Sequence, residues 1–91
     1  MVKHYDITLY YESQIEGFRF SIMAKALQLN ITGYVRRQLS DCVFIEAEGE
    51  EKELEEFIAW CKKGPLGTQI TNVDFTEGEV KGFQTFEIQH R

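Results

Sequence analysis

Gln14-Ile15-Glu16-Gly17-Phe18-Arg19 separates a segment with the pattern of a strand from a segment with the pattern of a helix. Before it, apolar and polar residues alternate from Tyr5 to Tyr10, which predicts a strand with one buried face. After it, apolar residues recur at three- and four-residue spacing as far as Leu29, which predicts an amphipathic helix. The apolar face of that helix is expected to hold Phe20, Met23, Ala24, Ala26 and Leu27.

The rest of the chain continues with the same two patterns. Further strands are predicted at 31–37, 43–48, 68–76 and 83–89, with a turn at Leu39-Ser40-Asp41 joining the first two of these as a hairpin. A second helix is predicted at 50–63, with an apolar face made of Leu54, Phe57, Ile58 and Cys61. The order βαββαβ plus a C-terminal strand predicts an α+β, ferredoxin-like two-layer sandwich: an antiparallel sheet with two helices on one face. Because no linker interrupts the chain, residues 1–91 are expected to form one domain.

Composition narrows the classes of function. The net charge is −5 and no basic patch is visible, which argues against nucleic acid as a partner. No apolar run is long enough to cross a membrane or to serve for export, so a cytoplasmic protein without membrane partners is expected. Cys42 and Cys61 lack metal-ligand spacing and are expected to be reduced apolar residues. His4 and His90, near the two ends of the chain, are expected at the surface, and no metal site is predicted.

Two motifs resemble those of the acylphosphatase family. Phe18-Arg19 resembles the end of that family's phosphate loop, G-R-V-Q-G-V-x-F-R, and Gln14 and Gly17 keep residue types of the loop. Gly33-Tyr34-Val35-Arg36 resembles its second motif, G-[FWY]-[AV]-[KR]-N, at the family's spacing. The resemblance covers the whole chain, with further matches at Ala47-Glu48-Gly49, Gly64-Pro65 and Gly82-Phe83.

The resemblance implies a phosphate site, and one residue pattern supports it independently. An Arg that opens a helix opposes the helix dipole, so Arg19 is expected to point into an anion site built from loop amides. By resemblance, the phosphate-binding residues are Gln14, Ile15, Glu16, Gly17, Phe18 and Arg19. The ligand is expected to be a small phosphorylated or otherwise anionic molecule, with no metal or cofactor taking part.

The family's water-orienting Asn corresponds to Arg37 in this chain. An Asn side chain both donates and accepts hydrogen bonds, whereas a guanidinium only donates. The loop also departs from the family at Ile15, a β-branched residue in a Gly position, and at Glu16, whose carboxylate repels phosphate. These changes predict a degenerate active site, with Arg19 and Arg37 at the catalytic positions, weak or no hydrolysis of carboxyl phosphates and residual anion binding.

Three other hypotheses compete with this one. The chain could be a working acylphosphatase with a rearranged loop, in which Gln14 or Gln38 holds the water. An RNA-binding module of the same element order is disfavoured, because its third strand, Cys42 to Glu48, would be acidic. A ligand-sensing or oligomerising domain is neither supported nor excluded by the sequence, although a monomer is expected.

Overall fold

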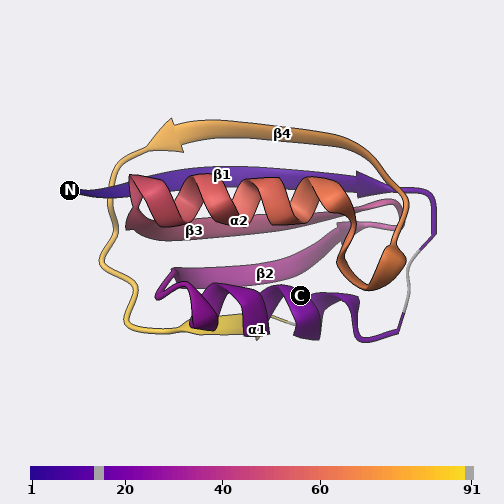
Figure 1. Cartoon of the computed structure of the whole chain (residues 1–91), viewed down its shortest axis with the longest axis horizontal. Helices are drawn as coiled ribbons and strands as arrows, with labels where there is room; N and C mark the ends of the chain where they lie inside the picture. The colour runs from indigo at the N-terminus through magenta and orange to yellow at the C-terminus, as the bar shows by residue number, and fades with distance from the viewer. Residues whose placement is uncertain (14–15, 90–91) are drawn as a thin grey trace.

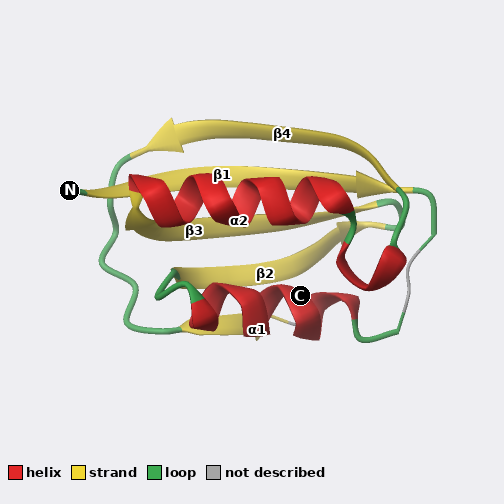
Figure 2. Ribbon diagram, in the orientation of Figure 1, coloured by secondary structure: helices red, strands yellow, loops and turns green. Residues whose placement is uncertain are grey.

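The computed structural model describes residues 1–13 and 16–89 as a two-layer sandwich. Five strands form one sheet in the order β4-β1-β3-β2-β5. Helices α1 and α2 both lie on one face of this sheet (Figure 1), and Figure 2 shows the helical layer in front of the strands. The elements in chain order are β1 (Val2–Tyr11), α1 (Phe18–Gln28), β2 (Thr32–Leu39), β3 (Cys42–Glu50), α2 (Glu51–Lys63), the 3-10 turn η1 (Pro65–Gly67), β4 (Ile70–Gly78) and β5 (Phe86–Gln89). The ferredoxin-like fold predicted from the sequence is therefore confirmed.

The C-terminal strand departs from the expected antiparallel sheet. The four strands β4, β1, β3 and β2 pair antiparallel, as predicted. In contrast, β5 pairs parallel with β2, with Gly33 opposite Phe86, so the sheet is mixed. The reason is topological: β4 occupies the edge beside β1, and the chain then crosses to the opposite edge before β5 begins (Figure 1).

The core lies between the sheet and the helices. Alternate residues of β1 and β3 form the sheet side of the core. On the other side, α2 contributes the four apolar residues predicted from the sequence, which are all buried. The ring of Phe57 packs edge-on against that of Phe86, with 6.4 Å between their centroids. Both cysteines are buried and free, as expected. None of the helices described here is long and apolar enough to cross a membrane.

Helix α1 buries only part of the predicted face: Ala26 is buried and Met23 packs partly buried against the core, whereas Phe20, Ala24 and Leu27 are exposed. Its buried residues are Phe18, Ile22 and Ala26, which follow one another at four-residue spacing. By contrast, Phe20 is 66% exposed and Leu27 is 48% exposed. Since α1 itself carries apolar side chains in nearly every direction around its axis, their spacing does not select one face. The face is instead set where Phe18 packs edge-on against Tyr11, with 5.1 Å between the ring centroids.

Gly33 lets β2 approach β3 closely near the start of the hairpin. Its φ is +139°, and a Cβ built at this position would lie 1.8 Å from the backbone oxygen of Glu46. A side chain there would push the two strands apart. Gly33 thus sets the path of β2 toward its far end, where Arg37 lies.

Candidate active site

Three elements meet at the end of the sheet where the candidate site lies. There β1 ends at Tyr11, β2 ends at Leu39 and α1 begins at Phe18 (Figure 1). The pairing register shifts at both strand ends, between Tyr10 and Tyr11 in β1 and between Arg37 and Leu39 in β2. Such irregularities end regular pairing and turn side chains away from the sheet, and they are common beside active sites.

The beginning of α1 provides positive potential. Gly17 adopts a left-handed conformation with φ 84°, and its carbonyl oxygen accepts the first helical hydrogen bond, from the Ser21 amide at 2.9 Å. The first turn holds no acidic residue, and no side chain among the described residues caps it. The positive end of the helix dipole therefore acts together with the guanidinium of Arg19, the second residue of the helix.

The two arginines predicted for the site, Arg19 and Arg37, both act electrostatically on the side chain of Tyr11. Its ring is buried against Phe18, and burial raises the pKa of Tyr11 above its ordinary value of 10.0. The positive charges of Arg37 and Arg19 both act to lower the same pKa, so both guanidinium groups lie close enough to act on this phenol. The structure thus brings Arg19 and Arg37, which are distant in sequence, within electrostatic range of one side chain.

The residues predicted for the site differ in how far they are exposed to solvent. Gln14 and Ile15 lie outside the described residues. Glu16 and Gly17 are exposed, whereas Phe18, the first residue of α1, is buried. Arg19 is half-buried, and Arg37 is exposed at the end of β2, opposite Val43 of β3. Their roles in binding and catalysis stay predictions.

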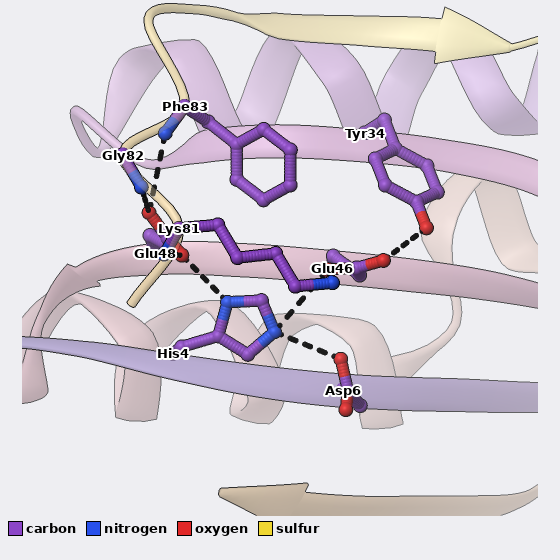
Figure 3. Close-up of polar contacts among 8 residues, drawn as sticks. All are labelled: His4, Asp6, Tyr34, Glu46, Glu48, Lys81, Gly82 and Phe83. Atoms are coloured by element: carbon purple, nitrogen blue, oxygen red, sulfur yellow. Dashed lines mark hydrogen bonds and ion pairs between the residues drawn. The ribbon is translucent and has the colours of Figure 1, made fainter. Parts of the chain in front are cut away.

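A second polar cluster lies on the opposite, helix-free face of the sheet (Figure 3). The prediction of a surface position for His4 was wrong: the residue is 1% exposed, while His90 lies outside the described residues. His4 belongs to β1 and lies opposite Glu48 of β3, with Asp6 and Glu46 as the next pair on the same face. The sequence does contain a pattern that could have predicted the cluster: charged or ionisable residues occupy alternate, even-numbered positions in both strands. That pattern can be used only once β1 is known to begin at Val2.

Hydrogen bonds and ion pairs satisfy this cluster. The His4 imidazolium donates from Nδ1 to Glu48 at 2.6 Å and from Nε2 to Asp6 at 2.9 Å. The Lys81 ammonium donates to Glu46 at 2.8 Å, and the hydroxyl of Tyr34 donates to the other oxygen of Glu46. The carboxylate of Glu48 also accepts the backbone N–H groups of Lys81, Gly82 and Phe83 (Figure 3). The cluster thus fastens the segment after β4 to the sheet.

The pKa values of this cluster show that its charges favour one another. Burial works against the charge on His4, but the hydrogen bonds to Glu48 and Asp6 outweigh it and raise the pKa of His4 above 6.5. Burial likewise opposes the charge on Glu48, but the hydrogen bonds from the Lys81 backbone, His4 and Gly82 hold its pKa below 4.5. The pKa of Glu46 is also lowered, against its burial, by Lys81 and Tyr34.

By residue type, His4, Asp6 and Glu46 could also hold a metal ion. One ligand atom from each lies within 4.8 Å of the others. However, the Lys81 ammonium already contacts Glu46, and His4 already bridges two carboxylates. Protein cations therefore occupy the places next to these oxygens, and the cluster is accounted for as a structural ion network.

Comparisons with known proteins agree with the fold and with the motifs around the candidate site. The acylphosphatase family model matches residues 13–88. An acylphosphatase from Synechococcus sp. (strain CC9902) is 39% identical over 74 residues, which cover 81% of this chain but only 63% of that protein. One from Acaryochloris marina (strain MBIC 11017) is 38% identical over 72 residues, 79% of this chain and 77% of that protein.

A solved structure extends the agreement to three dimensions. The crystal structure of acylphosphatase from Bacillus subtilis superimposes with a TM-score of 0.89 and 29% sequence identity, covering 98% of this chain and 99% of that one. The matched segment includes Gly17, Phe18, Arg19 and the whole of β2, so the loop, the helix start and the second motif all fall within the similarity. The chain belongs to the acylphosphatase family.

Proposed function

We propose that this protein binds small phosphate-bearing anions at Arg19 and hydrolyses carboxyl phosphates weakly or not at all. The observation that carries the proposal is the position of Arg37 at the end of β2, where its charge acts on Tyr11 together with that of Arg19. Two guanidinium groups and the positive end of α1 suit the binding of a phosphoryl dianion. They supply no group that accepts a proton from water.

The chemistry explains why binding and hydrolysis separate at this site. In hydrolysis of an acyl phosphate, a water oxygen bonds to phosphorus while the bond from phosphorus to the acyl oxygen breaks. The carboxylate leaves with the electron pair, and the proton of the water passes to solvent or to a phosphoryl oxygen. Because carboxylate is a good leaving group, the main contributions of the protein are to hold the phosphoryl group and to place the water.

Arg37 weakens the second of these contributions. A side chain that accepts a hydrogen bond from the water can hold the oxygen lone pair toward phosphorus, whereas a guanidinium presents only N–H groups. Losing an oriented nucleophile costs on the order of 100-fold in rate. Binding of the phosphoryl group is expected to persist because Arg37 adds positive charge.

A second function has its own support. The relatives reported above are named acylphosphatases, and the family match spans the loop and both motifs. An active enzyme would need another acceptor to hold the water, and Gln38 lies next to Arg37 in β2. In either case we propose a cytoplasmic monomer that needs no metal or cofactor and does not bind nucleic acid.

Hydrolysis of benzoyl phosphate by four proteins tests the proposal. The wild type is expected to be slow, Arg37→Asn to gain on the order of 100-fold, and Arg19→Ala to lose binding of inorganic phosphate in a calorimetric titration. Arg36→Asn is the matched control, because Arg36 lies over the Phe44 ring, 5.2 Å from its centroid, on the face of the sheet away from the helices. Rapid turnover by the wild type, with no gain in Arg37→Asn, would support the active enzyme instead.

A further inference from the structure

The hydroxyl of Tyr11 is the one buried side-chain oxygen or nitrogen in the described part of the chain that lacks a hydrogen-bond partner. Tyr11 is only 2% exposed, so bulk water does not satisfy this group. Buried polar groups in native proteins are almost always paired, and an exception calls for an explanation. A ligand that accepts a hydrogen bond from this hydroxyl is one such explanation.

The position of Tyr11 places its side chain at the candidate site. As the last residue of β1, it shares the helix-facing side of the sheet with Leu9. Leu9, Val43 and Arg37 form one row across β1, β3 and β2, so Arg37 leaves the sheet on this same side. The Tyr11 ring meets the edge of Phe18, the residue directly before Arg19. Two elements near the phenol therefore each carry an arginine: Arg37 in β2 and Arg19 in α1.

The charges around Tyr11 suit an anion. A phenol is protonated at neutral pH, and burial raises the pKa of Tyr11 further, so the hydroxyl is a donor. Arg37 and Arg19 contribute positive charge, while Cys42 and Asp41 act on the phenol in the opposite sense. Two cationic groups beside an unsatisfied donor match the oxygens of a phosphoryl group better than they match a neutral ligand.

We infer that the Tyr11 hydroxyl is a third side-chain ligand of the phosphoryl group, donating a hydrogen bond to one of its terminal oxygens beside Arg19 and Arg37. This inference rests on the proposed function, because it takes anion binding at Arg19 as given. It assigns the preferred ligand to the class of terminal phosphoryl groups, which carry the negative charge and the acceptor oxygens that one hydroxyl donor and two guanidinium groups would bind. Tyr11 acts here in binding, and no step of the hydrolysis is assigned to it.

Tyr11→Phe separates this role from simple packing. The ring keeps its contact with Phe18, and only the unsatisfied hydroxyl is removed. A buried donor without a partner is unfavourable, so the variant is expected to unfold at the same or a higher temperature than the wild type. Its affinity for inorganic phosphate is expected to fall about 10-fold or more, since hydrogen bonds to charged groups are the stronger ones. Binding and stability would then change in opposite directions.

The experiment is a calorimetric titration of inorganic phosphate into the wild type, Tyr11→Phe, Tyr10→Phe and Arg19→Ala. Tyr10 is the matched control, because it is the neighbouring tyrosine and lies on the opposite face of the sheet. Phosphate is also expected to produce a near-ultraviolet tyrosine difference spectrum in the wild type and in Tyr10→Phe but not in Tyr11→Phe. A purely structural tyrosine would give no such signal.

The possible failures are distinguishable. If the wild type and Arg19→Ala both fail to bind phosphate, the proposed function falls and the inference falls with it. If the wild type binds phosphate, Arg19→Ala does not, and Tyr11→Phe binds as tightly as the wild type, only the inference is overturned. A Tyr11→Phe protein that is clearly less stable than the wild type would also overturn it, because the hydroxyl would then have a partner within the protein.

Discussion

Replacement of Glu48 by Gln removes one negative charge from the middle of the helix-free face while keeping the size of the side chain. Glu48 is 2% exposed. One of its oxygens accepts from His4 at 2.6 Å and from the Lys81 amide at 2.5 Å, and the other accepts from the Gly82 and Phe83 amides at 3.0 and 3.3 Å. A Gln can keep only one oxygen, and its NH₂ group would face the two donors on the other side.

The magnitude follows from those two lost bonds. Hydrogen bonds that involve a charged group contribute about 1.5–3 kcal/mol each, so the loss of two costs about 3 kcal/mol or more. This is a large part of the roughly 5–15 kcal/mol that stabilises a typical domain. We expect the segment 81–83 to detach first, because Glu48 is the acceptor for all three of its backbone N–H groups.

The dependence on pH provides an internal check with a definite sign. The pKa of Glu48 is lowered below 4.5, so its contribution to stability is present above that value and is lost as the pH falls through its folded pKa. The pKa of His4 is raised above 6.5, so its contribution is complete below 6.5 and is lost as the pH rises through its folded pKa. The difference between wild type and Glu48→Gln is therefore expected to be largest between about pH 4.5 and 6.5.

The assay is urea unfolding of wild type, Glu48→Gln, His4→Gln and the double variant at several pH values. Glu55→Gln, on the exposed side of α2, controls for the loss of one negative charge at the surface. A double-mutant cycle gives the coupling between His4 and Glu48, which we expect to exceed about 1 kcal/mol at pH 5.5. If Glu48→Gln costs no more than Glu55→Gln, or if its cost does not change with pH, the ion network does not hold the segment in place.

Two further predictions concern the scaffold. Gly33→Ala forces a Cβ to within 1.8 Å of the Glu46 backbone oxygen, and thermal unfolding should show a loss of about 3 kcal/mol or more. The control is Gly67→Ala, because Gly67 also has a positive φ, +76°, but an added Cβ would meet nothing within 4 Å. This variant should lose only about 1–2 kcal/mol of unfolding free energy. If Gly33→Ala and Gly67→Ala lose the same amount, the close approach of β2 and β3 is unimportant for stability. Burial raises the pKa of Cys61 to about 12, so a thiol reagent should not modify the native protein but should titrate two thiols in denaturant without reductant. Rapid modification of native Cys61 would show that the core opens there.

The sequence predicted the fold well where one pattern dominated. In α2, charged residues cover one side, so the apolar stripe that includes Leu54 and Phe57 had only one possible direction. In α1, apolar residues on nearly all sides left the direction open, and the pattern chose Phe20 and Leu27, which are exposed. Packing against Tyr11, which is a tertiary contact, decided the question. The parallel pairing of β5 with β2 is equally a property of the whole sheet, which no local pattern reports.

The sequence predicted the two arginines of the candidate site but not the buried tyrosine beside them. Arg19 and Arg37 follow from the two motifs, and in the structure the charges of both act on one buried phenol. The predicted strand ends at Tyr10, which leaves Tyr11 in the segment before the predicted helix. In the structure Tyr11 extends β1, its amide donates to the Asp41 carbonyl at 3.0 Å, and its ring packs against Phe18 at the start of α1.

Packing alone does not explain why this position carries a Tyr. A Phe would fill the same volume against Phe18 without burying an unpaired hydroxyl, and Tyr11 makes no hydrogen bond through that group among the described residues. The cluster around His4 shows the opposite situation, since each of its buried charges has a partner within the protein. The helix-free face is therefore satisfied by the protein itself, whereas the end of β1 holds a buried donor that no described residue satisfies and on which the charges of Arg19 and Arg37 act. This contrast supports anion binding at Tyr11, Arg19 and Arg37 independently of whether the water needed for hydrolysis can be held there.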